Sequence, residues 1–164
     1  MLISKELQEG INAQIGHEFA ASMQYIAIAG YFKRENLELL ANLFFEQAEE
    51  ENEHAMKFVN YILDTSGELR IPVIPEAKFD FTSAEEAVEA AQNWEIEVTD
   101  QINSLMDLAK EQNDHLAQFF LQWYIDEQLE EITKMDQLLS VVRRAGENNL
   151  LMVEAYLAHI TKGE

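Results

Sequence analysis

Apolar residues recur at alternating steps of three and four along four stretches of the chain, the spacing of helices that pack in a bundle. Each stretch has about 30 residues, which is roughly 45 Å of helix at 1.5 Å per residue. The pattern predicts long helices at about 4–34, 36–65, 83–111 and 114–145, and a short fifth helix at about 149–160.

Each long helix has one largely apolar stripe that should face the core of the bundle. In chain order the stripes are Ile11, Ile15, Glu18, Ser22, Tyr25, Ala29 and Phe32; Leu37, Leu40, Phe44, Gln47, Glu51, His54, Phe58 and Tyr61; Ala84, Val88, Ala91, Glu95, Val98, Ile102, Leu105 and Ala109; and Ala117, Leu121, Tyr124, Gln128, Glu131, Met135, Leu138 and Val142. A carboxylate interrupts every stripe near its middle, and no Lys or Arg occurs in any of them. This interruption is the most informative feature of the sequence.

The connections between the helices predict the topology. Short turns at 33–36 and 113–114 make two antiparallel hairpins. The connection at 66–81 holds both prolines and can span roughly 50 Å when extended, enough to cross the whole bundle. We therefore expect an all-α, ferritin-like four-helix bundle with one long crossover loop and a short C-terminal helix. Residues 1–164 fit a single domain.

The four interrupting carboxylates should meet at one height. Glu18 and Glu51 lie at nearly equal distances from the first turn, and Glu95 and Glu131 lie at nearly equal distances from the second. Antiparallel helices bring residues at equal distances from their turn together, and His54 follows Glu51 by one helical turn. Sequence spacing alone thus predicts four glutamates and one histidine in the middle of the bundle.

Such a cluster of buried charges calls for a bound cation. One unpaired buried charge costs several kcal/mol, and the stripes offer no cationic side chain. Carboxylate oxygens with one imidazole form a hard ligand set that suits Fe, Mn or Zn. Glu51 and His54 can ligate one metal together, and a glutamate can bridge two. The second ring nitrogen of His54 should need an acceptor from a neighbouring helix.

Charge and composition limit the classes of molecule that the protein is expected to bind. The formal net charge of −20 repels nucleic acid and anionic membranes and attracts cations. The absence of cysteine excludes a disulfide framework and cysteine-ligated metal sites. The N-terminus shows no basic region followed by an apolar run, and no stretch approaches a membrane span. These features predict a cytoplasmic protein with neither nucleic-acid nor membrane partners.

Taken together, the spaced motifs resemble those of the bacterial and archaeal non-haem ferritins, over essentially the whole chain. The motifs are Glu18, the run 51–54, Glu95 and the run 123–131. The resemblance implies an iron-storage ferritin with ferroxidase activity. Such a protein oxidises Fe(II) with O2 or peroxide and keeps ferric oxyhydroxide inside a homo-oligomeric shell of 24 subunits.

The resemblance also implies roles for single residues. The ligands of the two ferroxidase irons would be Glu18, Glu51, His54, Glu95 and Glu131, with Glu51 as the bridge and Gln128 close by. A third iron site, sharing Glu131, would be formed by Glu50, Glu127 and Glu130. Tyr25 would lie near the irons as the catalytic residue that supplies an electron, and Trp123 would support it.

Two positions differ from those of the bacterioferritins and argue against a haem, and other functions stay open. Asn52 stands where bacterioferritins place a haem-binding methionine, and Glu131 stands where they repeat the histidine of Glu-x-x-His, so no haem is expected. A di-iron oxidase or peroxidase without a storage role, and a non-enzymatic acidic scaffold, remain alternative functions. A structural polar network, a merely packed Tyr25 and a solvated third-site surface remain alternative readings of the residues.

Overall fold

The computed structural model describes residues 2–161, and the regular secondary structure in that range is helical. Its elements are α1 (Lys5–Arg34), α2 (Glu38–Asp64), α3 (Ala84–Glu111), α4 (His115–Ala145), the 3₁₀ turn η1 (Glu147–Asn149) and α5 (Leu150–Thr161). None of these helices is both long and apolar enough to cross a membrane.

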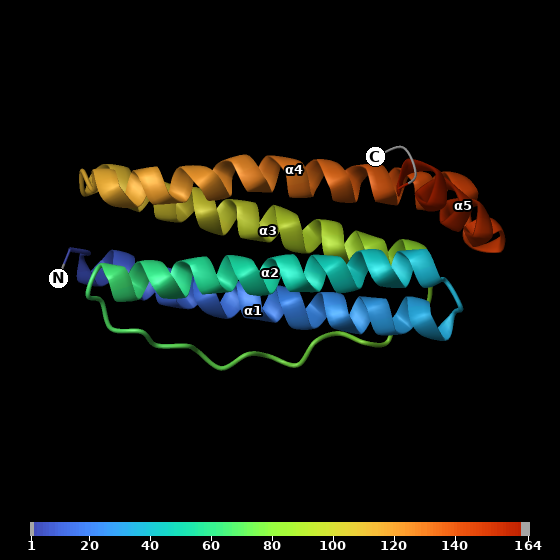
Figure 1. The fold of residues 1–164 in the computed structure, drawn as a ribbon, viewed down its shortest axis with the longest axis horizontal. Helices are drawn as coiled ribbons and strands as arrows, with labels where there is room; N and C mark the ends of the chain where they lie inside the picture. Colours follow the sequence, from blue (N-terminus) through green and yellow to red (C-terminus); the bar gives the residue numbers. More distant parts are fainter. Residues whose placement is uncertain (1, 162–164) are drawn as a thin grey trace.

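The four long helices form two antiparallel pairs, α1 with α2 and α3 with α4 (Figure 1). The connection from α2 to α3 runs the full length of the bundle, so that α3 starts at the end where the α1–α2 turn lies. The short α5 lies at that same end, beside the last turns of α4. This is the predicted four-helix bundle with one long crossover and a fifth helix.

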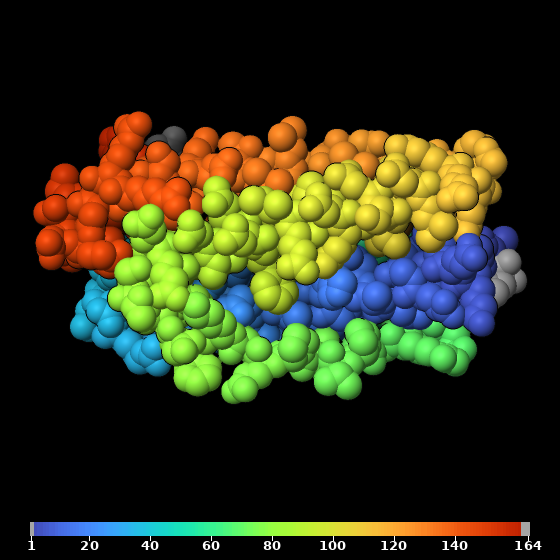
Figure 2. All heavy atoms as spheres, turned by 180° about the vertical axis from the view of Figure 1, so that it is seen from behind, coloured from blue at the N-terminus to red at the C-terminus, as the bar shows by residue number. Residues whose placement is uncertain are grey.

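Polar side chains of α1 hold the crossover connection in place. The amide of Asn12 donates to the Glu68 carbonyl over 2.9 Å and accepts from the Arg70 N–H over 3.0 Å. The amide of Gln24 makes the same pair of bonds with the backbone of Lys78, at 2.8 and 2.9 Å. Because these amides satisfy backbone groups that lack secondary structure, the extended segment follows α1 closely (Figure 2).

Side chains from the C-terminal region cap two of the long helices. The residue before α2 is Leu37, whose side chain cannot cap, and Glu154 of α5 instead accepts from the Leu39 and Leu40 N–H groups, both over 2.9 Å. Glu147 accepts in the same way from two N–H groups at the start of α3, both over 3.1 Å. Carboxylates at helix N-termini are favourable both as acceptors and toward the helix dipole, so these contacts hold η1 and α5 against the bundle.

The apolar core is divided into two clusters along the bundle axis. One cluster, near the α1–α2 turn, includes Phe32, Phe44 and Val142. The other, toward the opposite end, includes Ile11 and Phe58. The predicted carboxylates interrupt all four helices between these clusters, so that a polar layer separates two apolar halves.

Candidate metal centre

The polar layer buries the mid-bundle residues that the sequence singled out. One carboxylate comes from each long helix, and all are almost completely inaccessible. The exposed fractions are 1% for Glu18, 2% for Glu51, 4% for His54, 1% for Glu95, 4% for Gln128 and 2% for Glu131. Charged residues are rarely buried to this extent unless they are paired or bind a metal.

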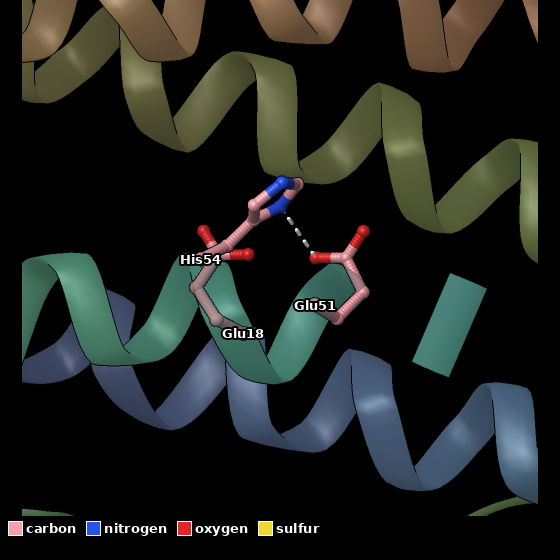
Figure 3. Close-up of side chains that lie close together, drawn as sticks. All are labelled: Glu18, Glu51 and His54. Carbon is pink, nitrogen blue, oxygen red and sulfur yellow. Dashed lines mark hydrogen bonds and ion pairs between the residues drawn. The ribbon is translucent and has the colours of Figure 1, made fainter. Parts of the chain in front are cut away.

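Ligand atoms in this layer converge in two groups, each with its candidate donors within 4.8 Å of one another. The first group is Glu18, Glu51 and His54, which face each other from α1 and α2 (Figure 3). The second group is Glu51, Glu95 and Glu131. Because Glu51 belongs to both, its carboxylate is placed to bridge two ions.

Glutamine amides hold the three carboxylates that are not shared. Each receives an N–H from a different helix position: Gln14 donates to Glu18 over 2.8 Å, Gln47 to Glu131 over 2.7 Å and Gln128 to Glu95 over 3.1 Å. Gln128 also lies 3.1 Å from the hydroxyl of Thr99. Gln14, Gln47 and Thr99 were not predicted as site residues, although Gln47 occupies a core position of its stripe.

The shared carboxylate has an unsatisfied oxygen. Oε2 of Glu51 lies 3.2 Å from Nδ1 of His54 (Figure 3), while Oε1 is buried without any hydrogen-bond partner among residues 2–161. A buried charged oxygen without a partner is strongly unfavourable. A divalent cation between the two groups would satisfy it, and the hard oxygen and nitrogen donors fit Fe(II). The residues present therefore fit the predicted pair of metal ions.

Burial raises the pKa of every carboxylate in the layer. For Glu18 the pKa is raised well above 4.5, first by desolvation and then by the charge of Glu51. Desolvation likewise raises the pKa values of Glu51 and Glu95, and that of Glu131 reaches about 7. Without a cation these carboxylates are therefore harder to ionise than in water, and a bound metal would favour their ionised form.

Tyr25 lies beside the second group, as the family resemblance implied. Its side chain is fully buried and its hydroxyl donates a short hydrogen bond to the carboxylate of Glu95. Desolvation, followed by the charge of Glu95, raises the pKa of this phenol well above 10. Tyr25 therefore stays protonated, with a carboxylate ready to accept its proton.

Glu127 lies near the second ring nitrogen of His54 but beyond hydrogen-bond distance, so the expected acceptor is approached and not bonded. Oε1 of Glu127 lies 3.7 Å from Nε2, and the Tyr124 hydroxyl donates to the His54 carbonyl over 2.7 Å. The indole of Trp123 packs edge-on against the imidazole, with ring centroids 5.3 Å apart. Carboxylates thus lie near both ring nitrogens, with Glu51 at Nδ1 and Glu127 at Nε2, and a metal bound at Nδ1 would leave Nε2–H directed toward Glu127.

The predicted third site is not assembled in the same way. Glu50, Glu127 and Glu130 belong to neither group of converging ligands in residues 2–161. Glu127 is directed to His54, and Glu50 lies 3.3 Å from the ammonium of Lys134. Lys134 also lies 4.0 Å from Glu131. Lys134 was not predicted as a site residue because it lies beside the apolar stripe of its helix. Its i+3 spacing from Glu131 is the one sequence signal that could have revealed it.

Comparison with known proteins agrees with this geometry. Residues 8–145 match the family model for the ferritin-like domain. The chain is 43% identical over 148 residues to ferritin BfrB of Mycolicibacterium smegmatis, and the match covers 90% of this chain and 81% of that one. It is 34% identical over 148 residues to the bacterial non-heme ferritin of Staphylococcus aureus, and that match covers 90% of this chain and 89% of the relative. An open pore ferritin from the archaeon Archaeoglobus fulgidus superimposes with a TM-score of 0.91 at 30% identity, covering 95% of this chain and 96% of that one. The chain belongs to the ferritin family, among the bacterial and archaeal non-haem ferritins.

Proposed function

We propose that this ferritin stores iron by oxidising Fe(II) at the mid-bundle layer, and that Glu18, Glu51, His54, Glu95 and Glu131 are the residues that hold the paired ions. The unsatisfied oxygen of Glu51, shared by both ligand groups, is the observation that carries the proposal. Iron is the substrate here, and the charge of −20 raises its concentration around the protein.

The pairing of sites matches the electron count of the reaction. Each Fe(II) gives up one electron on becoming Fe(III), and O2 takes two electrons and two protons to become hydrogen peroxide. Two ions held on either side of Glu51 supply both electrons at once. Fe(III) then hydrolyses with water to ferric oxyhydroxide and releases protons, and the abundant carboxylates provide surfaces on which that mineral can begin.

We assign Tyr25 to supplying the second electron to O2 when only one of the two positions holds Fe(II), so that the count of two electrons is still met. Its hydroxyl already donates to Glu95, which belongs to the second ligand group. A phenol that loses an electron also loses its proton, and Glu95 lies in position to take it. Gln128, which bonds Glu95, is assigned to orienting that carboxylate rather than to binding iron through its own N–H.

A closed shell, with 24 subunits as the family resemblance implies, is the assembly that we propose. α5 leaves apolar side chains on the surface, with exposed fractions of 75% for Leu151 and 66% for Met152. Exposed apolar side chains also occur on α1, at Met23 and Ile26, and on the crossover connection, at Val73. Exposed apolar surface of this kind is typical of contacts between subunits.

Aerobic addition of Fe(II) tests the site. We expect Glu51→Ala and His54→Ala shells to oxidise Fe(II) far more slowly than the wild type, followed by the absorbance of Fe(III). Glu53→Ala is the matched control, because Glu53 is exposed on the same helix. Wild-type rates in both site variants would refute the assignment.

Light scattering tests the assembly. Twenty-four chains of 18.9 kDa make a particle of about 450 kDa. A monomer or dimer that still oxidises iron would instead favour a di-iron oxidase or peroxidase without storage.

A further inference from the structure

Lys134 sits at the rim of the metal layer, between α2 and α4. It follows Glu131 by three residues on α4, and its Nζ lies 4.0 Å from Oε1 of that carboxylate. Nζ also lies 3.3 Å from Oε2 of Glu50 and makes a short hydrogen bond to Oε1 of Gln47. The ammonium therefore has oxygen atoms from three residues around it, an arrangement that would also suit a bound cation.

Gln47 links this ammonium to the interior of the layer. Its side chain is fully buried, and its Nε2 donates to Glu131 over 2.7 Å. Because the N–H points inward to the carboxylate, the amide oxygen points outward to Lys134. The amide oxygen of Gln47 and the carboxylate of Glu50 thus hold the ammonium of Lys134, although the lysine side chain is 41% exposed.

Two of the four carboxylates expected at a third iron site already contact this ammonium, namely Glu50 and Glu131. A third, Glu127, is directed to His54 instead. We propose that Lys134 takes the place of a third metal ion at the α2–α4 rim, so that each chain holds two ions in the bundle rather than three. This inference rests on the proposed function, because it concerns the residues around the paired ions.

The ammonium of Lys134 limits the number of ions that the layer can bind. The ammonium is covalently attached, so it cannot dissociate or be oxidised as an iron ion can. It also repels any further cation that approaches Glu131 from the rim. Iron can then enter only the two positions that share Glu51. The lysine acts as a specificity-determining residue for the number of ions, and it needs no direct contact with iron.

Counting ions in crystals separates this inference from its alternative. Zn(II) is the probe, because it is redox-inert and its anomalous scattering locates each ion. We expect two ions in the layer of the wild type and a third in Lys134→Met, bound by Glu50 and Glu131. Lys110→Met is the charge-matched control, since Lys110 is exposed on α3 and its one ion pair among residues 2–161 is with Asp107, and it should keep two ions. Lys134→Gln, which keeps a polar side chain, serves if the methionine variant does not fold.

Each outcome has a distinct meaning. A third ion at the rim of the wild type, with Lys134 displaced, overturns the inference. The inference is also overturned if the Lys134 variants bind the two ions at Glu51 but no third ion at the rim. No ion at Glu51 in the wild type overturns the proposed function itself. A third ion at the rim of Lys110→Met would show that overall charge, and not the position of Lys134, sets the count.

Discussion

Replacing Glu131 by Gln should stabilise the iron-free protein while weakening its metal site. The carboxylate is 2% exposed, and desolvation raises its pKa from 4.5 to about 7, against the opposing effect of Lys134. In the unfolded chain the same group titrates near its usual value. The folded protein therefore keeps a proton that the unfolded chain has already lost, and ionising the group in place weakens the fold.

The sign and size of the effect follow from that difference. The contribution of Glu131 to stability is lost as pH rises from about 4.5 through 7, because the folded state binds more protons across that window. At 1.36 kcal/mol per pH unit the full loss is about 3 kcal/mol per chain, most of it between about pH 5 and 8. Glu131→Gln cannot ionise, and its amide oxygen still accepts from Gln47.

Guanidinium chloride titrations of chelator-treated protein measure this difference at fixed protein concentration. We expect Glu131→Gln to exceed the wild type by about 2–3 kcal/mol per chain near pH 8 and by much less near pH 5. Glu130→Gln, exposed on the same helix, removes the same charge and should change little at either pH. Equal stability of Glu131→Gln and the wild type near pH 8, or an equal gain in the control, would refute the reasoning.

Three further substitutions test single contacts. Glu127→Gln removes the acidic neighbour of His54 and should weaken Zn(II) binding by about 10–100-fold in a calorimetric titration, with unchanged melting of the iron-free protein. Glu154→Ala removes both acceptors at the start of α2 and should lower the free energy of unfolding by about 1–2 kcal/mol, whereas loss of less than about 0.3 kcal/mol would contradict the capping role. Gly16→Ala would place its Cβ 2.2 Å from Cγ of Pro72, so it should cost about 1–3 kcal/mol and speed proteolysis of the crossover connection, while wild-type resistance would contradict the close packing.

The layer was predictable because the position of a residue along a helix sets its position along the bundle axis. With a fixed rise per residue and short turns, equal counts from a turn bring two side chains to one level. Glu18 and Glu51 obey this rule across the first turn, as do Glu95 and Glu131 across the second, and all four are buried together in the structure. Their convergence is confirmed, whereas their binding of iron stays a prediction.

The contacts at the edge of the layer were not predictable in the same way. Lys134 has four rotatable side-chain bonds, so its place in the sequence does not fix where its ammonium lies. The caps from Glu147 and Glu154 join positions more than 60 and 110 residues apart, and no local pattern indicates such pairs. Periodicity predicts which face a residue occupies, but not which distant polar group a long side chain reaches.

The choice of amides inside the layer explains how it can be both ordered and ready for metal. Each unshared carboxylate is oriented by one glutamine N–H, the pairs being Gln14 with Glu18, Gln47 with Glu131 and Gln128 with Glu95. An amide fixes a carboxylate in place without neutralising it, whereas a lysine in the same position would form an ion pair and remove the need for a cation. The cationic side chain at this level, Lys134, stays at the rim and 4.0 Å from the nearest unshared carboxylate. Glu51, the shared one, keeps an oxygen with no partner among residues 2–161. The carboxylates are therefore held in position, and among residues 2–161 neither a lysine nor an arginine pairs with Glu51 at the point where two ions would meet.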